Sequence, residues 1–236
     1  EETETQWGLR LASWALLLYL GAILAGVSSA FVLRIILLQE PYIPAYSFYL
    51  FLFTLPATLL SATSAIIFLL GFSTMYRHRG EPGSVRDRNL KRSFLLLLGS
   101  IVALITGWAV TLFLPFLLPT ALALDAFRTL QAVRVVLSLG IGIILAFLLA
   151  LLLYYVVVSL APERLMSRLN LAVVLFVLSA IVTFALALAS MWTDLPLQEF
   201  NEVFVAPSAL ALLLFWSVYR ASQRSLDPPP SQSLST

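Results

Sequence analysis

Charged residues are scarce in this chain of 236 residues: Asp, Glu, Lys and Arg together make up 11% of it, whereas 61% is hydrophobic. Soluble domains carry about 25% charged residues, because a chain folded in water needs polar side chains over its surface. The mean hydropathy of +0.97 reflects the same deficit. The composition therefore excludes a soluble enzyme, a nucleic-acid-binding protein and a disordered regulator, and it indicates an integral membrane protein.

Cysteine is absent, and histidine and lysine occur once each, as His78 and Lys91. Without cysteine the chain has no disulfide, thiolate metal site, iron–sulfur cluster or cysteine nucleophile. One histidine cannot supply two axial haem ligands, and no lysine lies in an apolar stretch where it could form a retinal Schiff base. We therefore expect no enzymatic activity, no metal site and no cofactor bound by this chain alone. Structural lipids are the expected non-protein component.

Ionisable residues are also missing from the middle of every apolar stretch. A charge at the bilayer centre costs about 2.5–3.5 kcal/mol on insertion scales, so such residues persist mainly where they serve a function. All twelve carboxylates lie in tails, loops or the ends of apolar stretches. This distribution argues against a proton or sodium pathway built from carboxylates. The lack of an intramembrane Asp pair or Ser–His pair argues against a membrane protease.

Six apolar stretches meet or approach the length of about 20 residues that a helix needs to cross a bilayer. They are approximately residues 11–38, 48–72, 94–118, 133–160, 169–191 and 203–219. Backbone polar groups in lipid must be hydrogen-bonded within their own segment, so each stretch is predicted to be a helix. The predicted fold class is all-α, a polytopic bundle of six transmembrane helices in a single domain, residues 1–226. A disordered cytoplasmic tail is predicted at 227–236.

Most basic residues fall on one side of this predicted bundle. The exceptions among the fourteen Lys and Arg residues are Arg34, Arg128 and Arg134. Because basic loops stay cytoplasmic, both termini are predicted to face the cytoplasm, in a multi-pass protein of the plasma (inner) membrane. A basic loop with a turn at Pro82-Gly83 is predicted between the second and third spans. Its basic residues are Arg77, Arg79, Arg86, Arg88, Lys91 and Arg92. Their expected role is topology, with contact to an anionic lipid or a partner as the alternative.

Small residues recur every four positions along five of the six spans, which places them on one stripe where another backbone can approach closely. The predicted helix-packing residues are Ala22, Gly26 and Ala30 in the first span, Gly99, Ala103 and Gly107 in the third, and Ser138, Gly142 and Ala146 in the fourth. Hydroxyl groups within the spans are expected to hydrogen-bond between helices or back to their own helix. These are Ser61, Thr63, Ser64, Thr106, Thr111, Ser179 and Thr183. Aromatic residues near span ends are expected to form belts at the membrane interfaces. These are Trp7, Tyr42, Tyr46, Tyr49, Tyr76, Trp192 and Tyr219.

Four motifs follow one another in the first half of the chain. They are Trp7-Gly8, the Ser/Thr-rich segment Thr58-Leu-Leu-Ser-Ala-Thr-Ser64, the basic stretch 77–92, and Leu96-Leu-Leu-Gly99. In this order, residues 7–110 resemble the subunit III family of haem–copper oxidases. The resemblance implies an all-helical accessory subunit of an electron-transport complex. The family's first-helix glutamate has no counterpart at residues 12–20, and Trp108-Ala-Val-Thr111 replaces its Gln/Glu pair. Its features tied to proton uptake and lipid contact are therefore not carried over.

Three functions remain open at this point. The leading hypothesis is a non-catalytic integral membrane subunit that packs against and stabilises a larger membrane complex, with a respiratory or photosynthetic electron-transport complex as the candidate. Its expected partners are other integral membrane subunits and membrane lipids. The alternative is a six-helix transporter or channel for a small neutral or apolar solute, built from two halves of three spans. A receptor or assembly factor that presents its basic loop to a soluble partner is the third possibility.

Overall fold

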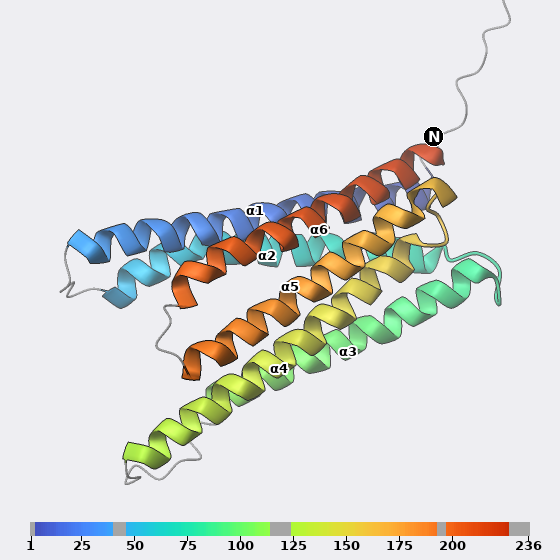
Figure 1. Cartoon of the computed structure of the whole chain (residues 1–236). Helices are drawn as coiled ribbons and strands as arrows, with labels where there is room; N and C mark the ends of the chain where they lie inside the picture. The colour runs from blue at the N-terminus through green and yellow to red at the C-terminus, as the bar shows by residue number, and fades with distance from the viewer. Residues whose placement is uncertain (1–2, 40–45, 114–123, 193–196, 227–236) are drawn as a thin grey trace, which may run out of the picture.

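The computed structural model describes residues 3–39, 46–113, 124–192 and 197–226, which form six long helices and no strand (Figure 1). The helices are α1 (Glu4–Gln39), α2 (Tyr46–Arg77), α3 (Val85–Phe113), α4 (Leu124–Val157), α5 (Met166–Trp192) and α6 (Leu197–Ser225), with a short 3-10 helix, η2 (Glu163–Leu165), before α5. Each long helix contains a segment long and apolar enough to cross a membrane. The prediction of an all-α, six-span membrane protein is therefore confirmed. The predicted tail at 227–236 lies outside the described residues.

The helices are longer than the apolar stretches that predicted them. α1 begins at Glu4 rather than near residue 11, and α3 begins at Val85 rather than near residue 94. The prediction that residues 77–92 form a loop is therefore wrong. Arg77 ends α2, only residues 78–84 connect the helices, and the basic residues from Arg86 to Arg92 lie in the first turns of α3. Hydropathy detects the part of a helix that sits in lipid, whereas polar helical turns beyond it carry no apolar signal.

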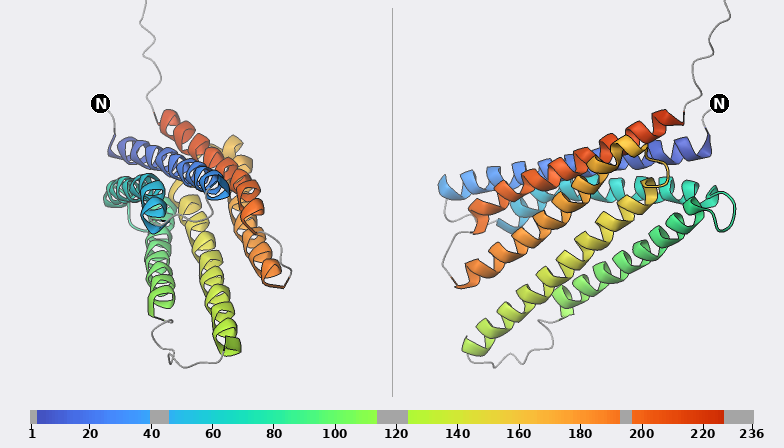
Figure 2. Two further views of the ribbon diagram at one scale, coloured as in Figure 1. Left: turned by 90° about the vertical axis from the view of Figure 1, so that its left-hand side faces the viewer. Right: turned by 45° about the vertical axis from the view of Figure 1, so that its right-hand side comes forward.

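The order of the helices around the bundle differs from their order in the sequence. α1 packs against α2 and α6, α5 packs against α6 and α4, and α3 packs against α4. α2 and α3 follow one another in the chain but scarcely touch. The six helices therefore form an arc in the order α2, α1, α6, α5, α4, α3 (Figure 2, left). Its two ends touch near the α2–α3 connection, where the rings of Tyr76 and Phe94 stack with centroids 5.3 Å apart, and have few contacts along the rest of the described helices. The helices converge at the end that carries the start of α1 and the end of α6, and they spread apart at the other end (Figure 1).

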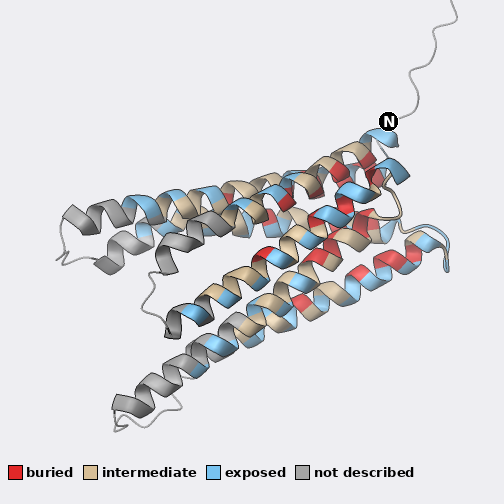
Figure 3. Ribbon diagram, in the orientation of Figure 1, coloured by how far each residue is buried: buried red, intermediate tan, exposed pale blue. Residues whose placement is uncertain are grey.

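The buried core lies at the convergent end of the bundle (Figure 3). It takes side chains from all six long helices and from η2. Phe215 and Tyr219 of α6 are among its largest members and are fully buried. The Tyr219 hydroxyl donates a hydrogen bond to the Leu153 carbonyl of α4 at 2.9 Å. The prediction that Tyr219 lies in an interfacial aromatic belt is therefore wrong, because its hydroxyl has a partner inside the protein and does not need water.

Candidate functional site

The connection between α2 and α3 is organised around one buried carboxylate. Asp87, in the first turn of α3, is 1% exposed and forms ion pairs with Arg79 Nε and Lys91 Nζ, both at 2.8 Å. The Gly83 N–H donates to Asp87 Oδ2 at 2.9 Å, and the Asp87 N–H donates to Ser84 Oγ at 3.1 Å. These two bonds satisfy backbone donors at the helix start, where no intrahelical partner exists. Ser84 and Asp87 therefore stabilise the start of α3, and the Asp87 carboxylate neutralises two basic residues.

Two further basic residues of this segment contact other helices. Arg86 Nη2 donates to Thr5 Oγ1 at 2.6 Å, which joins α3 to the first turn of α1. The Arg92 guanidinium lies 5.6 Å from the ring centroid of Tyr155 on α4. Arg77 and Arg88 are exposed. Four of the six predicted basic residues therefore have contacts within this chain, and Arg77 and Arg88 are the members most available to the surroundings.

Asp87→Asn is expected to loosen the α2–α3 connection. The amide oxygen can still accept the Gly83 N–H, but Arg79 and Lys91 lose their ionic partner, and one of the charges left behind is only partly solvated. We expect tryptic cleavage between residues 77 and 92 to become several-fold faster for the detergent-solubilised protein, measured by limited proteolysis. Glu81→Gln removes the same charge from an exposed position in the same connection and is the control. Equal cleavage rates for the two variants would show that Asp87 does not organise this segment.

Two glycines, Gly8 of α1 and Gly71 of α2, lie at a close backbone contact between these helices. A Cβ placed on Gly71 would lie 2.7 Å from the Gly8 carbonyl oxygen and 3.0 Å from the Ala12 nitrogen. Two turns along, Ser64 Oγ donates to the Ala15 carbonyl at 2.7 Å, a buried hydrogen bond between the same helices. The sequence pattern did not predict this pair, because Gly8 precedes the first predicted span. The sequence does contain a glycine near the start of α1 and another near the end of α2. Antiparallel packing of the two helices places these glycines opposite each other.

The predicted packing residues of α1 lie further along the same helix pair. Ala22 is buried. Gly26 faces α2, and a Cβ added to it would lie 3.8 Å from the Ala57 Cβ, an ordinary van der Waals contact. The side chain of Ala30 lies outside the described part of the structure. α1 therefore meets α2 through small residues over several turns, as close approach of transmembrane helices requires.

The predicted packing residues of α3 face α4. A Cβ on Gly99 would lie 3.6 Å from Leu148 Cδ1, and a Cβ on Gly107 would lie 3.3 Å from Ile141 Cγ2. Ala103, between them, is half-buried. The glycines of α3 thus make room for branched side chains of α4, which is ridge-into-groove packing of one helix on another.

The predicted packing residues of α4 line an open groove. Gly142 is exposed, and among the described residues no atom of another helix lies within 4 Å of its Cβ position. The groove has a volume of about 270 Å³ and is lined by Gly142, Ile143 and Ala146 of α4, Phe176, Ser179, Ala180, Thr183 and Phe184 of α5, and Ser208 of α6. The side chain of Ser138 is outside the described part. We call this hollow the α4–α6 groove.

Hydroxyl groups at this groove are already engaged within the protein. The hydroxyls of Ser179 and Ser208 lie 2.6 Å apart and link α5 to α6. Thr183 donates to the Ser179 carbonyl at 2.8 Å. Outside the groove, on α3, Thr106 likewise donates to the Val102 carbonyl at 2.9 Å. The expectation that span hydroxyls hydrogen-bond between helices or back to their own helix is confirmed at these positions. Their bonds stabilise the bundle and leave the groove predominantly apolar.

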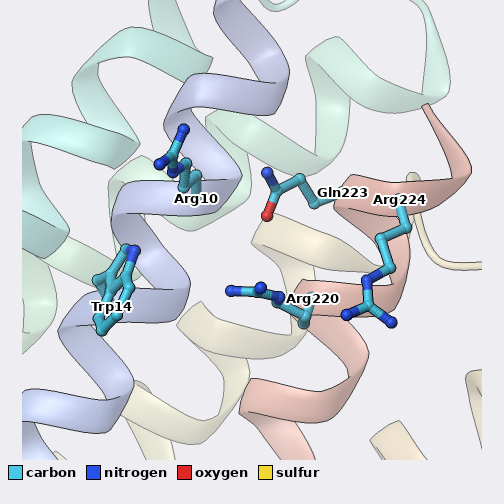
Figure 4. A pocket seen from close by; sticks show the side chains of 5 residues that line it. All are labelled: Arg10, Trp14, Arg220, Gln223 and Arg224. Carbon is cyan, nitrogen blue, oxygen red and sulfur yellow. The ribbon is translucent and has the colours of Figure 1, made fainter. Parts of the chain in front are cut away.

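A second hollow lies between α1 and α6 at the convergent end (Figure 4). It has a volume of about 270 Å³ and is lined by Arg10, Trp14, Arg220, Gln223 and Arg224. Arg10 and Trp14 are one turn apart on α1, and Arg220 and Arg224 are one turn apart on α6, so each pair shares a helix face. Figure 4 shows Arg220 and Gln223 reaching from α6 toward the α1 side chains. We call this hollow the basic groove.

An apolar hollow continues the basic groove along the two helices. Its volume is about 410 Å³, and its lining is Trp14, Leu17, Trp216, Ser217, Arg220, Ala221 and Arg224. Trp14, Arg220 and Arg224 belong to both hollows, so the two are continuous. In the sequence these arginines indicate only topology. A signal was present in the Arg10-to-Trp14 and Trp216-to-Arg220 spacings of four residues, but nothing in the sequence indicated that they meet.

Comparison with protein-family models, with curated proteins and with solved structures finds no match to this chain. Its own residues therefore carry the functional argument. Among the residues that the structure describes, no three His, Asp or Glu side chains gather as metal ligands would. The described hollows offer arginines, indoles and an apolar groove with exposed glycine backbone. Such groups can bind lipid or another helix.

Proposed function

We propose that this chain is a non-catalytic integral membrane subunit that packs against and stabilises a larger membrane complex. The observation that carries the proposal is the exposed backbone of Gly142 in the α4–α6 groove. Small residues in transmembrane helices allow a second helix to approach closely. On α1 and α3 such residues are covered by helices of this chain, whereas Gly142 is not. A helix of a partner subunit is the occupant that suits this open face.

The open arc supports the same proposal. α2 and α3, at its two ends, each pack mainly against one neighbour, and large apolar side chains such as Leu59, Ile66 and Val102 are exposed on them. An arc of this kind leaves long apolar faces that partner helices can cover. The narrower proposal, an electron-transport complex, is supported by the resemblance of residues 7–110 to the subunit III family.

The direct test is to extract the native membrane in mild detergent and to isolate this chain with whatever remains bound. Stoichiometric membrane subunits would support the proposal. Haem or pigment absorbance in the same fraction would support an electron-transport complex, because the only histidine here is His78 and another subunit would have to ligate a haem. A colourless, monodisperse species containing this chain alone would contradict the proposal.

Gly142→Leu is expected to reduce the partner recovered with this chain about tenfold, which corresponds to roughly 1.4 kcal/mol of binding free energy. The leucine side chain fills the groove and keeps a partner helix at a distance. Recovery is measured by quantitative mass spectrometry of the purified fraction. Gly140→Leu is the matched control, since its Cβ position is equally open but it lies outside the lining of the groove. An equal loss of recovered partner in both variants would show that the partner interface is not at the α4–α6 groove.

A transporter or channel for a small neutral solute is the second candidate. The observation that favours it is the presence of three hydroxyl-bearing residues, Ser179, Thr183 and Ser208, at one apolar hollow. Solute flux into vesicles containing the purified chain alone would support it. Loss of that flux in Ser179→Ala, with the protein still folded, would place the pathway at the α4–α6 groove.

A further inference from the structure

We propose that the basic groove binds the phosphodiester headgroup of an anionic phospholipid, whose acyl chain lies along the adjoining apolar hollow. The site is formed by α1 and α6 of one chain. The inference therefore goes beyond the proposed function, because the chain has the same groove with or without partner subunits.

Charge complementarity is the first argument. Among the described residues that line the two hollows, three are arginines and none is Asp or Glu. Arg220 and Arg224 take part in none of the ion pairs found among the described residues, whereas Arg10 already has a partner within the protein and lies 6.0 Å from the Trp7 ring centroid. A guanidinium presents paired N–H donors that match two oxygens of a phosphate group. Arg220 and Arg224 lie one turn apart and can address a single phosphodiester together.

The position in the bundle is the second argument. Arg10 and Arg220 lie about 8 Å inside the ends of α1 and α6, at 1.5 Å of rise per residue. The basic residues predicted to face the cytoplasm lie on the start of α1, the α2–α3 and α4–α5 connections and the end of α6. These segments are all at this same end of the bundle (Figure 1). Basic pockets between transmembrane helices at a cytoplasmic surface are a known form of anionic lipid recognition. Arg10 and Arg220 also border the apolar stretches predicted at residues 11–38 and 203–219, so the groove is expected at the level of phospholipid headgroups.

The order of side chains along the two antiparallel helices also fits a phospholipid. Outermost are Arg10, Gln223 and Arg224, and deeper along the groove come Leu17 and Trp216. Trp14, 49% exposed, lies between the two zones, as an indole at a membrane interface does. This polar-to-apolar order matches a headgroup followed by an acyl chain. A free phosphate or an acidic segment of a soluble protein would leave the apolar hollow unfilled.

The test titrates the detergent-purified full chain with phosphatidylglycerol or with phosphatidylcholine and measures bound lipid by native mass spectrometry. We expect the wild-type protein to prefer phosphatidylglycerol. Arg220→Gln with Arg224→Gln should weaken phosphatidylglycerol binding about thirty-fold, since each arginine at a membrane surface contributes about a factor of five. Arg77→Gln with Arg88→Gln removes two exposed charges from the same end of the bundle and should leave the affinity nearly unchanged. Equal affinities in the two double variants would overturn the proposal.

Two further measurements separate the possible occupants. Inorganic phosphate at millimolar concentration should not displace the lipid, and displacement would make the groove a site for soluble anions instead. A groove variant that keeps its phosphatidylglycerol but loses partner subunits would show that a protein segment occupies the groove. Wild-type protein treated with a photoactivatable phosphatidylglycerol should be cross-linked at Trp14, Leu17 or Ala221, which decides the matter even if the glutamine variants do not fold. Cross-links confined to other helices would overturn the proposal.

Discussion

Replacing Gly71 by alanine is expected to destabilise the protein by about 2–3 kcal/mol, although it adds a single methyl group. The new Cβ would lie 2.7 Å from the Gly8 carbonyl oxygen and 3.0 Å from the Ala12 nitrogen, and both are backbone atoms that cannot rotate away. α1 and α2 must then separate locally. Overpacking of this kind typically costs 1–3 kcal/mol. The shift also strains the nearby Ser64–Ala15 hydrogen bond.

The measurement is the free energy of unfolding from titration with a denaturing detergent, followed by far-ultraviolet circular dichroism. Gly21→Ala is the matched control on the same helix pair, because the nearest atom to its Cβ position, Leu60 Cδ1, is 4.0 Å away. Alanine is the better helix former by about 1 kcal/mol, so the control should be neutral or slightly stabilising. If both variants unfold alike, the contact between Gly8 and Gly71 does not hold the helix pair.

Tyr219→Ala is expected to cost about 3 kcal/mol and Tyr219→Phe about 1 kcal/mol. The ring is fully buried where α6 meets α4, so its removal leaves a cavity. Phenylalanine keeps the ring and removes only the hydroxyl that bonds the Leu153 carbonyl at 2.9 Å. The same unfolding titration separates the contribution of packing from that of the hydrogen bond.

Leu213→Ala is the control for truncation of a large side chain on α6. Leu213 is 41% exposed on the outer face of the same helix. Truncating Leu213 should lower the free energy of unfolding much less than Tyr219→Ala does, because it removes few protein contacts. If Tyr219→Ala were as stable as Leu213→Ala, Tyr219 would not belong to a buried core at the convergent end.

The failed sequence predictions share a physical cause. The basic segment was taken as a loop because polar residues end a hydropathy peak, yet Ser84 and Asp87 satisfy backbone donors and begin α3 well before its apolar part. Tyr219 was placed in an aromatic belt because it lies at the end of an apolar stretch. Hydropathy gives the depth of a residue along a helix but not the side of the helix that faces protein. The direction of a side chain depends on the neighbouring helix.

The sequence by itself determined the environment and the elements of this protein. Its scarcity of charge places it in a membrane, and six apolar stretches that must satisfy their own backbone hydrogen bonds in lipid become six helices. The tertiary structure alone decided which helices meet. In lipid, an apolar side chain gains little free energy by contacting another helix instead of a lipid tail. The order of the helices therefore follows from close packing at particular residues. That fit brings Gly8 against Gly71, and it brings Arg10 of α1 beside Arg220 of α6, at opposite ends of the chain.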